Sequence, residues 1–134
     1  MLRPWGVDGY RLERIGGEGE FHKLVNAELA PGLIAQFLAA ARIQRMHFHH
    51  YAGVSGWVLS LPNELGLPYD VSVHDFVSVC PQFHFQEASG RYCGRPQEKD
   101  CNRCIAERPN HLGLDISAWR SLFYSHFARA ERVI

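Results

Sequence analysis

Residues 43–50 (IQRMHFHH) and 69–79 (YDVSVHDFVSV) decide the expected fold, because both stretches alternate side chains with the period of a β-strand. The first carries apolar side chains on one face and histidines on the other, and the second is rich in valine, which favours strands. Residues 54–65 (VSGWVLSLPNEL), which lie between them, carry apolar side chains at helical spacing. A strand, a helix and a strand in this order predict a βαβ unit with parallel strands.

The N-terminal third predicts two further strands and a helix. Residues 10–15 and 21–26 are expected to be short extended segments, and the glycine-rich stretch at 16–19 (GGEG) is expected to form the turn between them. Apolar residues recur at helical spacing over residues 30–43. This part of the chain therefore supplies another strand-to-helix step.

The C-terminal third contains a polar stretch and a last helix. Residues 80–111 hold all four cysteines with several glycines and prolines, which predicts a loop or insert. Asp115 is placed to cap a helix, and residues 132–134 are expected to begin a strand at which the chain ends in mid-element. The buried face of that helix is expected to carry Ile116, Trp119, Leu122, Phe123 and Phe127. The fold class is α/β with a mainly parallel sheet.

Composition narrows the class of protein. The chain has 134 residues, enough for a single domain, and 46% of them are hydrophobic. Fourteen basic residues balance fourteen acidic ones, which argues against a nucleic-acid partner. No apolar run reaches the roughly 20 residues of a membrane span, and the first ten residues lack the apolar core of a signal peptide. We expect a protein without a transmembrane segment that stays in the cytoplasm, where thiols are kept reduced.

Titratable side chains follow both central strands. In open α/β sheets, ligands bind beyond the carboxyl ends of the strands, where we expect His47, His49 and His50 to meet His74 and Asp75. Such a group could supply a base or a hydrogen-bond donor for a hydroxyl substrate. The alternative is structural: the first histidines would lie on a partly solvated strand face, and the histidine of the second strand would satisfy a backbone carbonyl.

Glycines follow the first strand. Gly53 and Gly56 would allow a ligand to approach the backbone closely. They do not form a GxGxxG pattern, so the sequence gives no support for a dinucleotide site.

The cysteines are spaced C-x12-C-x7-C-x2-C, at Cys80, Cys93, Cys101 and Cys104. Zinc prefers four tetrahedral thiolates or imidazoles, and the spacing favours a structural zinc site in an insert that needs a fixed shape. His84 and His111 are the substitutes if one cysteine is not a ligand. Free thiols and two disulfides are the alternatives. Four thiolates would close the coordination shell, which argues against a catalytic zinc.

Several motifs resemble one family. The stretch VSVHDFVSVCPQFHF (71–85), followed by GRYCGRP (90–96) and CNRC (101–104), is similar to bacterial glycosyltransferases of the GT-B, family 4 type. In those proteins a His-Asp-Tyr/Phe motif at a strand end precedes a cysteine insert and a helix with a DI..WR pattern, which residues 115–120 match. The stretches MHFHHYAG and LGLPYDVSVHD also resemble the preceding elements. The resemblance covers residues 43–134.

The resemblance implies an incomplete Rossmann-like domain over residues 1–134 with the insert at 80–111, the acceptor-side half of a GT-B enzyme. His74 matches the histidine beside the reaction centre, with Asp75 next to it, and His49 and His50 match the preceding strand end. We therefore expect His74 and Asp75 to be catalytic, and His49, His50 and Gly53 to bind the substrate. The implied reaction moves a hexose or deoxyhexose from a nucleotide sugar to a polysaccharide or lipid-linked glycan. The enzyme would be cytoplasmic or peripheral to the inner membrane face.

The resemblance is partial. The family's glycine-rich loop after its first strand is not recognisable, and the C-terminal domain that mainly binds the nucleotide sugar is missing. Without that domain the leaving phosphate is not stabilised, so the chain alone is not expected to catalyse transfer. Two other hypotheses remain: a free-standing zinc-binding interaction module, and a small metal-dependent hydrolase. The hydrolase would need an open site with an activated water, for which the histidine spacing offers no clear ligand set.

Overall fold

A computed structural model describes residues 1–5, 9–14, 21–26, 30–94 and 96–134. The chain divides into two compact units, which are described separately. The N-terminal unit comprises Met1–Gln44 and Gly53–Leu67, and the C-terminal unit comprises Arg45–Ala52 and Pro68–Ile134. The single domain expected over residues 1–134 stays a prediction.

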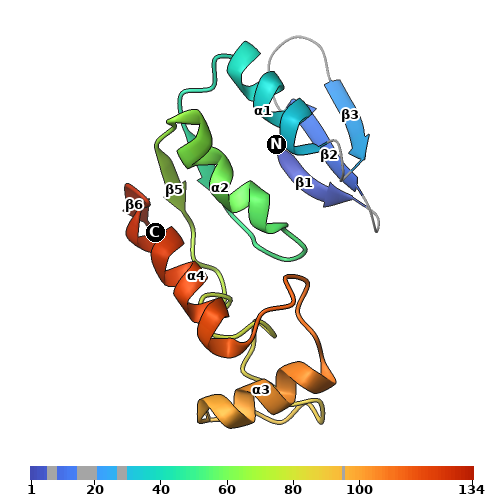
Figure 1. Cartoon of the computed structure of the whole chain (residues 1–134), viewed down its shortest axis with the longest axis vertical. Coiled ribbons are helices and arrows are strands. Elements are labelled where there is room, and N and C mark those ends of the chain that lie inside the picture. Colours follow the sequence, from blue (N-terminus) through green and yellow to red (C-terminus); the bar gives the residue numbers. More distant parts are fainter. Residues whose placement is uncertain (6–8, 15–20, 27–29, 95) are drawn as a thin grey trace. The chain divides into compact units, whose positions relative to one another are not determined.

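The N-terminal unit contains an antiparallel sheet of the order β1-β2-β3, formed by Leu2–Trp5, Gly9–Arg14 and Phe21–Asn26 (Figure 1). β2 and β3 confirm the two extended segments, whereas the glycine turn expected between them lies outside the described residues. The sequence did not predict β1, which contains Pro4. Proline cannot donate to a strand ladder and is tolerated on an edge strand, which is where β1 lies.

Two helices complete this unit. α1 spans Ala30–Ala40 and contacts α2, which spans Gly56–Leu65. Gly66 caps the C-terminus of α2, and its φ of 63° is the left-handed conformation that glycine adopts easily. Tyr10 connects the sheet to the start of α2: its hydroxyl accepts a hydrogen bond from the Ser55 N–H at 2.9 Å, and its ring meets the ring of Trp57 edge-on.

The C-terminal unit is built on a parallel sheet of the order β4-β5-β6, formed by Met46–Phe48, Tyr69–Val71 and Arg132–Val133. Phe48 lies opposite Val71, and Val71 opposite Val133. The parallel pairing of β4 with β5 and the short final strand confirm two predictions. A mainly parallel sheet is correct for this unit and wrong for the N-terminal unit. The chain is a mixed α/β protein.

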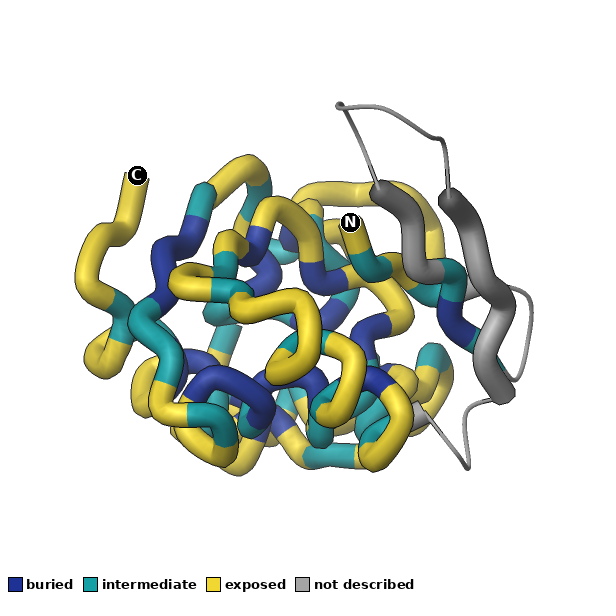
Figure 2. The backbone as a smooth tube through the Cα atoms, turned by 90° about the horizontal axis from the view of Figure 1, so that it is seen from above, coloured by how far each residue is buried: buried dark blue, intermediate teal, exposed yellow. Residues whose placement is uncertain are grey.

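α4 spans Ile116–Ala128 and packs on one face of this sheet. Asp115 caps it as expected, accepting a hydrogen bond from the Ala118 N–H at 2.8 Å. Trp119 and Phe123 are completely buried. The ring of His126, also buried, meets the ring of Phe48 on β4 edge-on, with 4.7 Å between their centroids. Figure 2 shows how buried and exposed stretches alternate along the backbone.

The other face of the sheet carries charge. Asp70 on β5 is buried, with 2% of its surface exposed, and it accepts hydrogen bonds from Arg45 at 2.9 Å and from Arg132 at 2.5 Å. The hydrogen bond from Arg132 is the main cause that lowers the pKa of the Asp70 carboxyl. The side chain of Glu131 accepts a further bond from Arg45. β5 thus has an apolar face toward α4 and one ionised group on the opposite face.

Two predicted elements differ from the structure. The strand expected at 69–79 ends at Val71. Farther along, Asp75 and Val77 form a turn, and the Val77 carbonyl accepts a hydrogen bond from the indole N–H of Trp119, so the chain does not continue as a strand to residue 79. Of the valines after the strand, Val77 is buried, whereas Val73 is exposed and its N–H bonds the Ile134 carbonyl at 2.8 Å.

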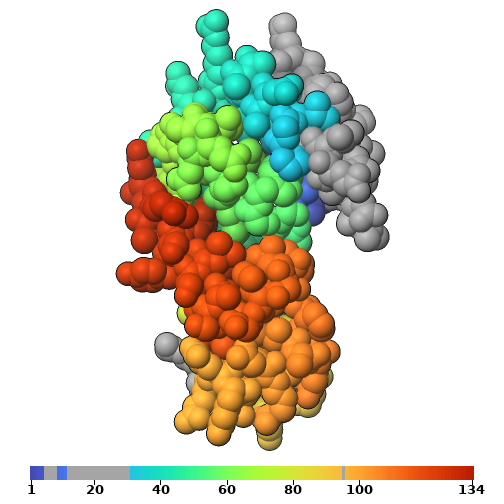
Figure 3. All heavy atoms as spheres, in the orientation of Figure 1, coloured from blue at the N-terminus to red at the C-terminus, as the bar shows by residue number. Residues whose placement is uncertain are grey.

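The stretch at 80–111, expected to be a loop or insert, contains a helix that the sequence did not predict: α3, Glu98–Glu107, which packs against α4 (Figure 3). Acidic side chains in its first turn favour the start of this helix. No helix among the described residues combines the length and apolar character needed to cross a bilayer.

Candidate functional site

The histidines predicted to form a site lie at one edge of the parallel sheet. β4 ends at Phe48 and β5 at Val71, and because these strands run parallel, the residues that follow both emerge at the same edge. The Ser72 N–H donates a hydrogen bond to the Phe48 carbonyl at 2.9 Å, which keeps the two segments paired just past the end of β5. The carboxyl edge of a parallel sheet is where such folds bind ligands.

The imidazole rings of three histidines form a row. The rings of His47 and His49 lie 3.9 Å apart between centroids, and the rings of His49 and His74 are stacked at 6.2 Å with an interplanar angle of 11°. Nε2 of His47 lies 2.9 Å from Oγ of Ser72. All three histidines are exposed. The row therefore joins the ends of β4 and β5 and presents ring nitrogens to solvent.

A second pair lies beside this row. Nε2 of His50 is 4.0 Å from Oδ2 of Asp75. Nδ1 of His50 accepts hydrogen bonds from the backbone N–H groups of Tyr51, at 3.1 Å, and Ala52, at 3.3 Å. These bonds assign the ring proton of neutral His50 to Nε2, which faces Asp75. His50 is thus held in one orientation by the backbone that follows β4.

Asp75 is less accessible than its histidine neighbours, with 16% of its side chain exposed. Its Oδ1 accepts a hydrogen bond from the Val77 N–H at 2.8 Å, which forms a turn directly after His74. Asp75 therefore fixes the backbone on which His74 is presented.

Aromatic and hydroxyl side chains that the sequence analysis did not assign to the site also lie here. Phe83 approaches the His50 ring, with 6.2 Å between centroids, and Phe76 is 54% exposed next to Asp75. Ser72, which contacts His47, could have been found from the alternation of β5, because it follows Val71 on the opposite face. Phe83 could not have been found in this way, since the loop brings it back from outside the strands.

Gly53 belongs to the N-terminal unit. Its φ is 68°, a left-handed conformation in which a side chain would be strained. Its role in ligand binding stays a prediction.

The four cysteines line one cavity of about 650 Å³ in the C-terminal unit. Cys101 and Cys104 lie three residues apart on α3, and hence on one face of that helix. Cys80 and Cys93 come from the segment before α3, where their N–H groups bond the carbonyls of Phe76 and Phe85. All four are half-buried free thiols. Neither His84 nor His111 lines this cavity.

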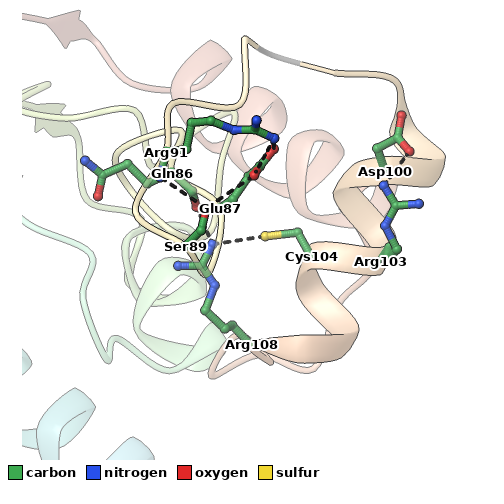
Figure 4. Close-up of polar contacts among 8 residues, drawn as sticks. All are labelled: Gln86, Glu87, Ser89, Arg91, Asp100, Arg103, Cys104 and Arg108. Carbon is green, nitrogen blue, oxygen red and sulfur yellow. Dashed lines mark hydrogen bonds and ion pairs between the residues drawn. The ribbon is translucent and has the colours of Figure 1, made fainter.

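Two arginines contact the sulfurs. Nη2 of Arg108 donates to Sγ of Cys104 at 3.1 Å and also to the Gln86 carbonyl, which connects α3 to the loop beside it (Figure 4). Nη2 of Arg120 donates to Sγ of Cys101 at 3.8 Å. Burial raises the pKa of the Cys101 thiol, Arg120 lowers it, and the nearby Cys80 and Cys93 raise it further.

As the side chains stand, no group of three or more His, Cys, Asp or Glu residues in the described part of the chain could hold a metal ion. The cavity gathers the thiols without arranging them as ligands. The structural zinc expected from the cysteine spacing therefore stays a prediction.

Comparison with known proteins leaves this site to be interpreted from its own geometry. No family model matches the chain, and no match was found among curated proteins or solved structures.

Proposed function

We propose that this chain is the acceptor-side portion of a glycosyltransferase, a partial Rossmann-like domain that receives a glycan or lipid-linked acceptor. One observation carries the proposal: the polar ends of β4 and β5 converge, so that His49 stacks on His74 and His50 faces Asp75. The sequence motifs around these residues, which resemble glycosyltransferases of the GT-B, family 4 type, support the same conclusion.

The four side chains have different roles in this proposal. His74 and His49 are exposed and contact the acceptor, because an imidazole nitrogen can accept a hydrogen bond or a proton from a sugar hydroxyl. Asp75 and His50 are positioning residues. The Asp75 carboxylate holds the turn after His74, and His50 is fixed by backbone N–H groups.

The surroundings suit a carbohydrate. Binding sites for small molecules combine aromatic surface with a few oriented polar groups. Here Phe83 lies beside His50, and the exposed ring of Phe76 follows Asp75. A sugar ring can place its C–H face on an aromatic ring while a hydroxyl reaches the histidines. The nucleotide sugar would be held by a donor domain outside these residues, which also stabilises the leaving phosphate.

The proposal is tested by titrating the histidine-labelled chain with methyl glycosides of hexoses and deoxyhexoses, while histidine ring signals are followed by NMR. We expect saturable shifts at His49 and His74 with at least one glycoside. His74→Ala should abolish the saturable shift at His49, because the acceptor loses one of its two exposed contacts.

His84→Ala is the matched control. His84 is an exposed histidine of the same unit, and its removal should leave the titration unchanged. The absence of saturable shifts at His49 and His74 with every glycoside, up to the solubility limit, would overturn the proposal. Shifts that survive in His74→Ala would remove His74 from the site.

A further inference from the structure

All four cysteines of the chain line the same cavity, although 23 residues lie between the first and the last. Two come from α3 and two from the loop that precedes it, so the cavity is the place where these segments meet. The four thiols are half-buried and form no disulfides, so they are available as sulfur ligands. The glycosyltransferase proposal makes no use of this cavity.

We propose that the cavity binds one zinc ion through Cys80, Cys93, Cys101 and Cys104, and that Arg108 and Arg120 hydrogen-bond the ligating sulfurs. Thiolates select zinc over magnesium or calcium, which require oxygen ligands. Four protein ligands fill the tetrahedral shell and leave no position for water or substrate. The ion is therefore structural, and it fastens α3 to the loop before it.

The positive charges of the two arginines would offset the negative charge of a zinc–thiolate complex. Four thiolates around one divalent ion leave a net charge of about minus two, which is costly to keep half-buried. Arg108 donates to Cys104 and Arg120 to Cys101, so each places a guanidinium on one sulfur of the α3 pair. Groups that hydrogen-bond metal ligands orient them and stabilise the bound ion.

The arginines are themselves fixed. Nε of Arg120 donates to the Val79 carbonyl at 3.2 Å, immediately before Cys80. Arg108 donates a hydrogen bond to the Gln86 carbonyl in the loop. Each arginine therefore joins a sulfur on α3 to the backbone of the loop that carries the other cysteines. Rotation of the cysteine side chains into ligand positions is required on binding, because the thiols are not arranged as a metal site.

The test begins with the purified full chain. We expect one zinc per chain by plasma mass spectrometry and four thiols protected from Ellman's reagent until a chelator is added. Addition of cobalt to the metal-free chain should give the absorption bands of a tetrahedral thiolate complex. Cys101→Ser should weaken the sulfur-to-cobalt charge-transfer band, which reports thiolate ligation even if that variant is less stable.

The arginines are tested by competition with a chromophoric chelator. Arg108→Leu and Arg120→Leu should each lower zinc affinity by roughly 10- to 100-fold, and lysine at either position should restore part of it. Arg103→Leu is the control, because Arg103 also lines the cavity but pairs with Asp100 at 3.0 Å. It should bind zinc like the unmodified chain.

Two results would overturn the zinc site: four reactive thiols in a metal-free protein that gives no cobalt spectrum, or an intact mass that shows two disulfides. Equal zinc affinity in the Arg103, Arg108 and Arg120 variants would overturn the role of the arginines. None of these outcomes depends on binding of a sugar.

Discussion

The two carboxylate oxygens of Asp75 contact different partners, so the residue has two separate roles: one oxygen stabilises a turn and the other faces a histidine. Oδ1 accepts the Val77 N–H at 2.8 Å, whereas Oδ2 lies 4.0 Å from Nε2 of His50. The sequence indicated Asp75 because it follows His74 at a strand end. It could not indicate the turn, since an aspartate after a valine-rich stretch is equally compatible with a continuing strand, as we expected over residues 69–79.

This division predicts different effects of two substitutions. Asp75→Ala removes the acceptor of the Val77 N–H and should lower the free energy of unfolding by about 1 kcal/mol. Asp75→Asn keeps an oxygen for that bond and removes only the charge, so its stability should stay close to that of the unmodified chain. Urea denaturation measures both. An equal loss in the two variants would show that the charge, rather than the turn, is what stabilises this segment.

Among the elements, α4 links the site to the core. The sequence predicted its Asp115 cap and a buried face, and the structure confirms the cap and the burial of Trp119 and Phe123. It adds that the indole N–H of Trp119 donates to the Val77 carbonyl at 2.6 Å, which holds the turn after Asp75 against the helix. Hydrophobic periodicity cannot reveal such a bond, because it depends on where a distant loop passes.

We expect Trp119→Phe to destabilise the chain by about 1 to 3 kcal/mol, because it leaves the buried Val77 carbonyl without its donor. Tyr124→Phe is the control: Tyr124 lies on the same helix with 78% exposure. Urea denaturation of the two variants gives the comparison. If Trp119→Phe unfolds at the same urea concentration as Tyr124→Phe, the indole bond contributes nothing measurable.

At the scale of the whole molecule, the core holds a histidine that hydrophobic periodicity missed. His126 lies seven residues after Trp119 and hence on the same face of α4, where it is 1% exposed. Its Nε2 lies 3.1 Å from the Tyr51 hydroxyl, and Nδ1 has no hydrogen-bond partner among the described residues. Burial, followed by the charge of Arg129, lowers its pKa to about 4.

A lowered histidine pKa makes stability depend on acid pH. Between pH 6.5 and about 4 the unfolded chain binds a proton at His126 that the folded chain does not. Stability from this residue is therefore complete above pH 6.5 and falls as the pH drops toward 4, by up to about 3 kcal/mol. Urea denaturation at a series of pH values measures this slope. The pKa of Asp70 is also lowered in the folded chain, but the stability that this residue contributes begins to fall only at a lower pH than that of His126.

His126→Gln should flatten the slope between pH 6.5 and 4, because glutamine does not titrate. His84→Gln, which changes an exposed histidine, should leave the slope in place. A slope of the same size in the His126 variant would assign the pH dependence to other groups.

The sequence alone determined the local features of this protein. Alternating residues predicted β4 and the start of β5, apolar spacing predicted α1, α2 and α4, and Asp115 predicted a cap. Strand order placed the histidines at one sheet edge. These features follow from the period of side chains along the backbone and from short-range hydrogen bonds, which can be inferred from neighbouring residues.

Only the tertiary structure decided the features that arise where segments distant in the sequence come into contact. It ended β5 at Val71, placed α3 within the expected loop, and brought all four cysteines to one cavity beside two arginines. It also buried His126 and gave the N-terminal unit an antiparallel sheet. Each of these outcomes depends on packing and hydrogen bonds between residues far apart in the chain, which no local pattern encodes.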